Sequence, residues 1–549
     1  MTYDDILHDV GELGPFQKRI YFLLCLPCFT LSPLLVLQVF SLGTPKHRCK
    51  LPNYGNDTYE LQGTFHEELV KSWVPADTSG DYDYDRCKLY KTDHMIYNTS
   101  DTESCSQWVY DESVFKSTFT TKDDLVCDDA IKIPNVQMVF FFGVLSGSII
   151  YGQISDLIGR KKTLYMCILL MIGSSLGLIP MENYYGFAVL MFILGGSLLG
   201  VYMTSYVLGM ELVGTSKRFL AGTINTFFLT TGQLYMVLMV YLLRDDKYFT
   251  LSVALPGVLF LPYYWLIPES CRWLISKGRT DEAIVILRKV ANSNNTKLDE
   301  DAVRRLPPPE KQAGVWKLFS TRTLGVWTVI IFFNWFVCSM SYYGVVLNTG
   351  NLGGDIYFNF TMLVLAEYPG KFFDLVLLDR IGRKRLYIAY LFIGAAAFLL
   401  TIWPIADGGD DLHYVLIALA MIGKLCITGA FGAIYVLSAE IFPTVVRNTG
   451  MGASSAVARV GSMLAPYIAK SADTVSGPVG KAIPLSVFGA VMLIAGVLTL
   501  ILPETLRKDL PESIPDVENL KKKTSSATKA TKEAATNDGY DNVEENSKL

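Results

Sequence analysis

The feature that most constrains this chain is a series of long apolar runs separated by short polar segments. A helix needs about 20 mostly apolar residues to cross the roughly 30 Å hydrocarbon core of a bilayer. Twelve segments meet this need: 20–42, 135–156, 163–180, 185–209, 219–242, 248–267, 323–347, 357–378, 386–404, 413–437, 448–470 and 482–502. The sequence therefore predicts an all-α membrane protein with 12 transmembrane helices.

The composition excludes several other classes of protein. Charged residues make up only 18% of the chain, whereas soluble domains are closer to about 25%. The net charge of −4 offers no basic surface for a nucleic acid. The chain has no Gly-x4-Gly-Lys-Ser/Thr loop of the kind that binds ATP phosphates, and His66-Glu67 lacks the second histidine of a zinc helix. We expect neither an enzyme nor a resident metal or cofactor.

Basic residues in the short loops predict the orientation, because cytoplasmic loops are enriched in lysine and arginine. They follow every second span: Arg160, Lys161, Lys162, Lys217, Arg218, Arg380, Arg383, Lys384, Arg385 and Arg447. This places three segments in the cytoplasm: the N-terminus 1–19, a central loop 268–322 with an amphipathic helix near 280–291, and a tail 503–549 that we expect to be disordered.

The opposite face opens with a long segment, 43–134, that is rich in cysteine. It contains Cys49, Cys87, Cys105 and Cys127. In an oxidising compartment these four predict two disulfides, with three possible pairings. Sequons at Asn56 and Asn98 predict glycosylation on the same side. A sensing or adhesion role for this segment is a weaker alternative to transport.

Three patterns occur twice, in the same order. Asp156-Leu-Ile-Gly-Arg160-Lys recurs as Asp379-Arg-Ile-Gly-Arg383-Lys, Glu211 with Arg218 recurs as Glu440 with Arg447, and Pro268-Glu269 recurs as Pro503-Glu504. Each copy follows the corresponding helix. The chain is therefore expected to form two pseudo-symmetric six-helix halves, 20–267 and 323–502, of like orientation. Parallel halves of this kind are the plan of a major facilitator transporter rather than a channel.

The repeated charges suggest a gate. We expect the eight residues to form cytoplasmic latches that hold one closed state and break as the inner side opens: Asp156, Arg160, Glu211, Arg218, Asp379, Arg383, Glu440 and Arg447. The alternative is that these groups only satisfy helix ends and anchor the topology.

Several longer motifs resemble one transporter family. They are residues 107–111 (QWVYD), 124–127 (DLVC), 268–274 (PESCRWL) and 439–448 (AEIFPTVVRN). Together they resemble the solute carrier 22 family. Residues 14–21 (GPFQKRIY) and 351–354 (NLGG) are most similar to its insect organic cation transporter-like members. The resemblance implies a polyspecific transporter of the plasma membrane, working by alternating access on small organic ions. A monomer is expected to suffice, and the oligomeric state stays open.

Charged residues inside a membrane span are costly, so they are candidates for function. The sharpest are Glu367, Lys371, Lys424 and Arg459, with Asp374 nearby. The resemblance implies that an aspartate matches Arg459 in cation-specialised members and an arginine matches it in carnitine-type and anion-type members. It also implies a lysine at the Lys371 position in anion-type members, and a glutamate at the Glu367 position in cation-type members.

This mixture of signs predicts organic cations or carnitine-like zwitterions as substrates. Arg459 would pair with a carboxylate and Glu367 with an ammonium. One alternative is an organic anion transporter or exchanger that uses Lys371 and Arg459. A structural alternative is that the charged groups of span 8 and Lys424 pair only with each other.

Aromatic residues supply the remaining candidates for the substrate site. Trp335, Tyr342 and Tyr343 lie in span 7 and Phe431 in span 10, and the resemblance places the first three in the family's central cavity. Aromatic faces attract cations and also hold flat apolar groups. The alternative is that these rings only pack the bundle or face lipid.

Overall fold

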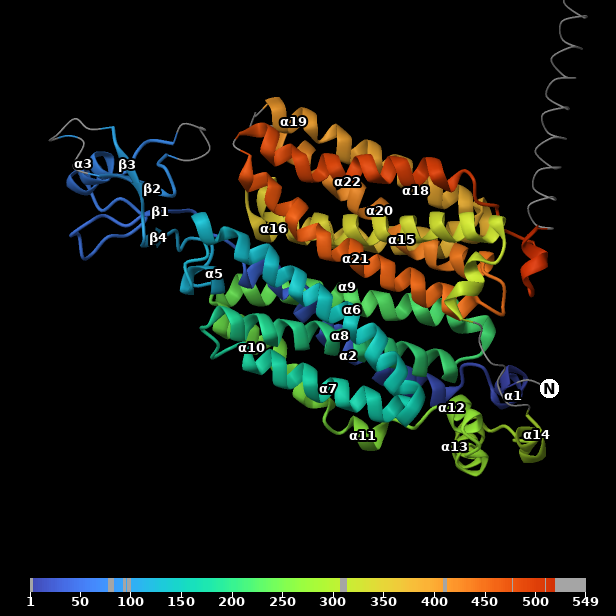
Figure 1. The fold of residues 1–549 in the computed structure, drawn as a ribbon. Helices are drawn as coiled ribbons and strands as arrows, with labels where there is room; N and C mark the ends of the chain where they lie inside the picture. Colours follow the sequence, from blue (N-terminus) through green and yellow to red (C-terminus); the bar gives the residue numbers. More distant parts are fainter. Residues whose placement is uncertain are drawn as a thin grey trace, which may run out of the picture.

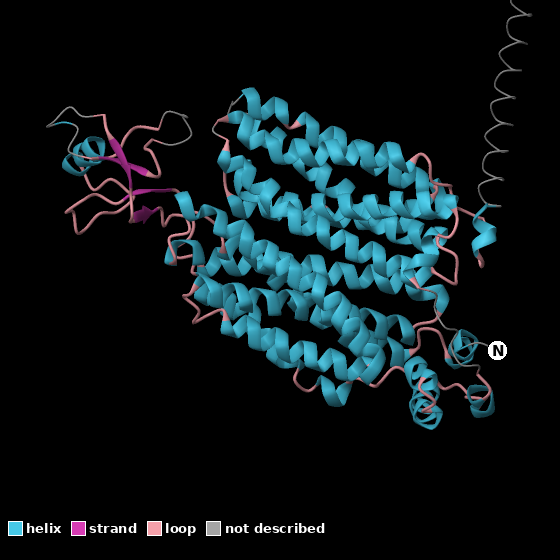
Figure 2. Cartoon of the chain, viewed as in Figure 1, coloured by secondary structure: helices cyan, strands magenta, loops and turns pink. Residues whose placement is uncertain are grey.

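The computed structural model describes residues 3–77, 83–91, 95, 100–306, 314–407, 412–475, 477–508 and 510–518. Long helices run side by side through one bundle, and a small region with short strands extends from one end (Figures 1 and 2). We call this end the loop end. The opposite end carries Gly159 and Gly382, and we call it the latch end.

The first six predicted spans form the N-terminal half. Their helices are α2 (Pro15–Ser41), α6 (Lys132–Ile158), α7 (Arg160–Gly177), α8 (Tyr184–Leu212), α9 (Arg218–Leu243), and a divided sixth segment of α10 (Asp246–Ala254), η3 (Leu255–Phe260) and α11 (Tyr263–Leu266). A short turn, η2 (Thr215–Lys217), precedes α9.

The last six predicted spans form the C-terminal half. Their helices are α15 (Arg322–Leu347), α16 (Ile356–Leu365), α17 (Glu367–Ile381), α18 (Arg383–Leu400), α19 (Ile402–Asp407), α20 (His413–Ile441), α21 (Arg447–Thr474) and α22 (Pro478–Thr499). A short turn, η5 (Asn348–Leu352), follows α15.

Three of the predicted spans, 248–267, 357–378 and 386–404, are not single helices. Proline explains the breaks, because it lacks an N–H and its ring clashes with the carbonyl four residues earlier. Pro369 and Pro404 lie four residues after Leu365 and Leu400, where α16 and α18 end. Pro256 lies at the start of η3.

Nine helices or helical stretches in the described part of the chain are long and apolar enough to cross a membrane. The predicted spans outside this set, 163–180, 357–378 and 448–470, are helical as well. They correspond to α7, which begins with three basic residues, to α16 and α17, where α17 carries two buried carboxylates and the half-buried Lys371, and to α21, which contains Arg459. The helices that depart from a plain membrane span are thus mainly those that bear candidate site residues.

Short elements cover the latch end of the N-terminal half. They are α1 (Tyr3–Val10), α12 (Cys271–Ser276), α13 (Thr280–Asn294) and α14 (Glu300–Arg304), and η4 (Val315–Phe319) precedes α15. Ile6 and Val10 of α1 pack in one apolar cluster with Trp273 and Leu287. The predicted amphipathic helix near 280–291 is confirmed as α13.

The tail does not leave the bundle at residue 503. Val517 is buried in the core of the C-terminal half, and the Thr444 N–H donates to the Pro511 carbonyl at 3.2 Å. The expectation of disorder from 503 onward is therefore wrong for the described tail residues, because apolar side chains anchor them. Residues 519–549 lie outside the described part of the chain.

The outer segment at the loop end is held by short strands and two disulfides. Its elements are β1 (His47–Cys49), α3 (Thr64–Trp73), β2 (Lys88–Tyr90), β3 (Thr102–Ser104), β4 (Trp108–Tyr110), α5 (Phe119–Lys122) and η1 (Cys127–Ile131). Strand β1 pairs antiparallel with β4, and β2 with β3. The disulfides join Cys49 to Cys105 and Cys87 to Cys127, which selects one of the three open pairings.

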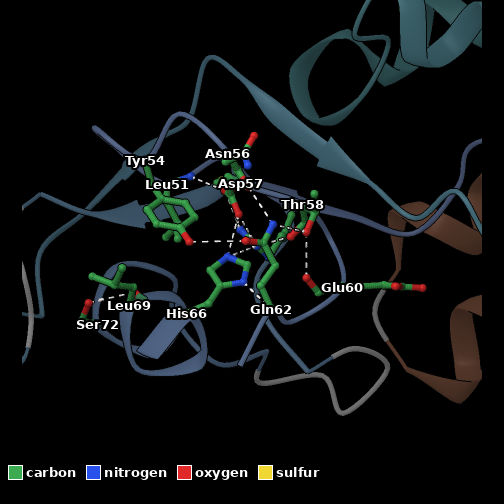
Figure 3. A network of polar contacts seen from close by, with 12 residues as sticks. Leu51, Tyr54, Asn56, Asp57, Thr58, Glu60, Gln62, His66, Leu69 and Ser72 are labelled. Carbon is green, nitrogen blue, oxygen red and sulfur yellow. Dashed lines mark hydrogen bonds and ion pairs between the residues drawn. The ribbon is translucent and has the colours of Figure 1, made fainter. Parts of the chain in front are cut away.

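A buried charge network organises one side of this outer segment (Figure 3). Arg48 binds both carboxylate oxygens of Asp57, at 2.6 and 3.0 Å. The Leu51 N–H donates to the same carboxylate at 2.7 Å, and His66 Nε2 lies 2.9 Å from it. The neighbouring Asn56 is exposed, so its predicted glycosylation stays open. Asn98 lies outside the described residues.

The two halves meet along several named contacts. Helix α6 packs against α21, and α9 packs against α16 and α17. Tyr467 of α21 donates to Asn135 of α6 at 2.8 Å. At the loop end, Tyr357 of α16 donates to the Val114 carbonyl of the outer segment at 2.7 Å. The outer segment therefore bridges both halves.

Candidate functional site

A buried carboxylate with two lysines lies where the halves meet. Glu367, the first residue of α17, is fully buried. Its Oε2 lies 3.2 Å from Lys371 Nζ, one turn along the same helix, and its Oε1 lies 3.1 Å from Lys424 Nζ of α20. One carboxylate thus neutralises one of two ammonium groups and leaves a net positive charge.

Hydroxyl groups from both halves complete this cluster. Tyr342 of α15 donates to Glu367 at 2.6 Å, and Thr230 of α9 donates to it at 3.0 Å. Lys371 donates to the carbonyl of Thr226 at 3.0 Å and also to the Thr230 hydroxyl. Since Thr226 and Thr230 belong to the N-terminal half, these bonds cross between the halves. Motion of one half against the other must change them.

Lys424 lies between the Glu367 carboxylate and the ring of Tyr342. Its Nζ lies 3.3 Å from the centroid of the Tyr342 ring, a geometry that gives cation–π attraction. Glu367, Lys371 and Lys424 therefore pair with each other, as the structural alternative expected. Asp374 lies apart from this pairing.

Four aromatic rings form a continuous cluster beside these charges. Trp335 packs against Tyr435 with centroids 4.3 Å apart, and Phe431 lies 6.0 Å from Tyr342 and 5.8 Å from Tyr435. The Trp335 indole N–H donates to Ser438 at 2.9 Å, so that ring is fixed by the C-terminal half itself. Trp335 is buried, whereas the other three rings of this cluster, Tyr342, Phe431 and Tyr435, are at least partly exposed and are candidates for contact with a ligand.

Tyr343 contributes at the boundary between the halves. Its ring lies 4.9 Å from that of Phe141 on α6. The sequence prediction did not include Tyr435 or Thr230. Tyr435 lies one turn after Phe431 on the same helix, and this spacing in the sequence could have indicated that the two rings share a helix face. Thr230 carries no signal of its own in the sequence.

Arg459 is a buried cation for which the described residues provide no counter-ion. It lies on α21 with 7% of its surface exposed, and its Nε has no hydrogen-bond partner within the described part of the chain. The hydroxyls of Tyr202 on α8 and Tyr435 on α20 are within electrostatic range of it. A buried guanidinium is a strong bidentate ligand for a carboxylate, and the residues described here do not supply one.

Each predicted latch closes within its own half. In the N-terminal half, Arg160 lies 2.8 Å from Asp156 and 3.5 Å from Glu211. In the C-terminal half, Arg383 lies 2.9 Å from Asp379 and 3.1 Å from Glu440. The two latches therefore have the same arrangement, as the repeat predicted.

The second basic residue of each latch motif donates from Nε to the carbonyl five residues before it. Arg218 donates to Val213 and Arg447 to Phe442, each at 3.2 Å. Arg218 in addition lies 2.6 Å from Asp4 of α1. Neither binds the glutamate seven residues before it. Arg218 therefore fastens the N-terminal helix to the latch end.

The third repeated motif caps the helix that follows each latch glycine. Glu269 accepts from the Arg160 and Lys161 N–H groups at 2.9 and 3.1 Å. In the same way, Glu504 accepts from the three N–H groups that open α18, at 3.0 to 3.4 Å. Gly159 and Gly382 have φ of 108° and 111°, a region that favours glycine, and a Cβ on either would collide with the capping carboxylate.

Removing a cap should lower stability without touching the central cluster. We expect Glu504→Ala to cost about 1–2 kcal/mol, because three N–H groups lose an acceptor at a positive helix terminus. The thermal midpoint of the purified protein measures this. Glu512→Ala, at an exposed tail residue, is the matched control, and equal midpoints for the two variants would contradict the capping role.

Comparison with known proteins gives consistent matches over most of the chain. Residues 92–515 match the family described as sugar (and other) transporter. The organic cation transporter protein of Drosophila melanogaster is 38% identical over 536 residues, covering 95% of this chain and 96% of its own. The organic cation/carnitine transporter 2 of Homo sapiens is 33% identical over 551 residues, covering 97% of each chain.

Solved structures agree on the fold. The xylose transporter XylE from E. coli, in a partially occluded inward open conformation, gives a TM-score of 0.60 at 15% identity, covering 90% of this chain and 99% of its own. Its inward open conformation gives 0.57 at 16% identity, covering 92% and 99%. The predicted major facilitator fold of two six-helix halves is confirmed, and so is the expectation of a transporter rather than an enzyme.

Proposed function

Because this chain belongs to the solute carrier 22 family, within the sugar (and other) transporters of the major facilitator superfamily, we propose that it carries small organic cations and carnitine-like zwitterions by alternating access. Relatives in this family are named organic cation and organic cation/carnitine transporters. The observation that carries the proposal further is Arg459, which is buried and has no anionic partner among the described residues. We assign it as the anchor for a substrate carboxylate.

The charge balance favours a substrate that brings a carboxylate. Lys371, Lys424 and Arg459 are three cations, and Glu367 is the single carboxylate of the central cluster. A zwitterion's carboxylate reduces this excess of positive charge at Arg459. Its ammonium can lie against the faces of Phe431 or Tyr435, where cation–π attraction needs no free carboxylate.

The structure gives less support to the expectation that Glu367 binds the ammonium group of the substrate. Both of its oxygens are already bound, by two lysines and two hydroxyl groups. The same pairing weakens the alternative of an organic anion exchanger, because Lys371 is bound to Glu367 and to α9. Arg459 is then the cation best placed to meet an anionic group.

In alternating access, the latches would hold one closed state and break as the inner side opens. We propose that the latch end faces the cytoplasm, with both termini there, and that the disulfide-bonded outer segment faces the exterior of the plasma membrane. The basic residues of the latch end and the disulfides of the loop end support this orientation. Rocking of one half against the other would exchange the bonds between Lys371 and α9.

Replacement of Arg459 tests the proposal. We expect Arg459→Asp to reduce uptake of labelled carnitine about 10- to 100-fold, since a charged hydrogen bond contributes about 1.5–3 kcal/mol. Uptake of tetraethylammonium should persist, because this cation has no carboxylate that Arg459 could bind. The measurement is initial uptake in expressing cells, with p-aminohippurate as the anionic probe.

Arg459→Lys serves as the matched control, because it keeps the charge and removes the bidentate geometry. It should retain part of the carnitine uptake. Membrane potential gives an independent check, since a cation gains about 2.3 kcal/mol per 100 mV on entry and a zwitterion gains none. Carnitine uptake that is unchanged in Arg459→Asp would contradict the anchor.

A further inference from the structure

A second buried carboxylate lies inside the C-terminal half, apart from the central cluster. Asp374 is on α17 with 8% of its surface exposed, and its Oδ1 has no hydrogen-bond partner among the residues that the structure describes. The basic residue nearest to it along the helix, Lys371, is bound to Glu367 and to α9. The described residues therefore give Asp374 no counter-ion of its own.

Two glycines of α20 make room for this carboxylate and for the tyrosine beside it. A Cβ at Gly432 would lie 2.2 Å from Asp374 Oδ2, and a Cβ at Gly429 would lie 2.6 Å from the ring of Tyr390. Tyr390 comes from α18, and its hydroxyl is the polar side chain that interacts with Asp374. That hydroxyl also lacks a bond of full hydrogen-bond geometry.

Within the described part of the chain, the helices around Asp374 supply no free positive charge to hold an ionised carboxylate. Helices α20, α18, α9 and α16 pack against α17. From α18 comes Tyr390, and from α20 come Cys426, which lies near Tyr390, and Lys424, which is bound to Glu367. Helix α9 directs Thr226 and Thr230 to Lys371, and Tyr357 of α16 is bound at the loop end.

An unpaired charge in such a place is costly, whereas a neutral carboxyl is tolerated. We propose that Asp374 is a proton-binding site within the C-terminal half, and that its proton is taken up from water and returned to water as the halves change position. One O–H bond forms and breaks per cycle, and no other reactant is needed.

The position of Asp374 links it to both working parts of the half. It lies two turns, about 10 Å, beyond Glu367 along α17 and five residues before Asp379 of the latch. Its carboxylate contacts α20 next to Phe431, and α20 also carries Lys424 and Glu440. Ionisation of Asp374 would require water or a donor between α17 and α20, and therefore a different packing of the helices that carry the site and the latch.

Proton binding is tested without any substrate. Infrared difference spectra of the purified full-length protein, recorded between mildly acidic and mildly alkaline pH, should contain the C=O stretching band of a protonated carboxyl in an apolar site. We expect this band to disappear in Asp374→Asn and to shift in Tyr390→Phe. It should be unchanged in Asp281→Asn, which alters an exposed carboxylate of α13. A band that persists in Asp374→Asn overturns the proposal.

The link to transport rests on the proposed function and is tested separately. In proteoliposomes, a gradient of one pH unit can drive about tenfold accumulation per coupled proton. We expect a pH gradient of one polarity to stimulate carnitine uptake by the wild type. In Asp374→Asn this stimulation should be lost, so that uptake with and without the gradient is about equal, while exchange of carnitine for carnitine persists. A full pH response in that variant overturns coupling through Asp374. If the wild type carries none of the probes, the proposed function fails, and the infrared result still decides whether Asp374 binds a proton.

Discussion

Glu367→Gln should be among the most damaging substitutions at the centre of the bundle. It leaves the fully buried ammonium group of Lys424 and the largely buried one of Lys371 without a counter-ion. Removing one partner of a buried ion pair costs about 3–5 kcal/mol, because the remaining charge stays desolvated. We expect a fall of several degrees in the thermal midpoint of the purified protein, together with loss of carnitine uptake.

Variants of Lys424 distinguish the loss of charge pairing from a change in side-chain packing at Glu367. Lys424→Met leaves Glu367 and Lys371 as a balanced pair, so its midpoint should lie close to that of the wild type. Adding Lys424→Met to Glu367→Gln removes one of the two stranded cations and should recover part of the lost stability. We therefore expect the thermal midpoint to be highest for Lys424→Met, lower for the double variant and lowest for Glu367→Gln. A Glu367→Gln protein as stable as Lys424→Met would contradict the pairing.

The repeat made much of the architecture predictable. Motifs that occur twice in the same order imply two halves of like orientation, and the structure gives the latches of Arg160 and Arg383 matching partners. The role of Glu269 and Glu504 was not apparent from the motifs alone. Their bonds go to backbone N–H groups more than 100 residues away in the chain, and such contacts leave no local periodicity.

The central site was predicted as a set of residues rather than as an arrangement. Charges in apolar spans are visible in any sequence, so Glu367, Lys371, Lys424 and Arg459 were all found. Which of them pair depends on how α17 and α20 face each other and on Thr230 from the other half. Only the structure separates Arg459, which has no counter-ion among the described residues, from the two lysines, which share one.

The breaks in the predicted spans have a local cause that hydropathy does not register. Average hydropathy stays high across Pro404, and the residues on both sides of Pro369 are mostly apolar, so a window of about 20 residues treats each region as one span. The missing N–H and the ring clash act on a single turn. One of these breaks places Glu367 in the first turn of α17, where a carboxylate is favoured by the helix dipole.

The outer segment should depend just as strongly on Asp57. Its side chain and that of Arg48 are almost fully buried. Asp57→Asn leaves the Arg48 guanidinium without its bidentate partner, next to Cys49 of a disulfide, at an expected cost of about 3–5 kcal/mol. The substitution keeps the Asn56-x-Thr58 sequon, so glycosylation is not altered by design. Hydrogen exchange of residues 43–77 should be markedly faster in the variant at neutral pH.

The pH dependence of this effect has a definite sign. Burial by itself would raise the pKa of the Asp57 carboxyl, but hydrogen bonds from Arg48, the Leu51 N–H and His66 outweigh it and hold the pKa below its usual value. A carboxyl with a lowered pKa in the folded state contributes stability above its unfolded pKa of about 4, and this stability is lost as the pH falls through the folded value.

The difference between wild type and Asp57→Asn should therefore be full at neutral pH and should shrink in acid, where Asp57 itself becomes protonated. Exchange is compared between the two proteins at each pH, so that the intrinsic pH dependence of exchange cancels. Asp128→Asn, at an exposed residue of η1, is the control and should match the wild type throughout. Equal protection of Asp57→Asn and wild type at neutral pH would show that the network in Figure 3 does not hold the outer segment together.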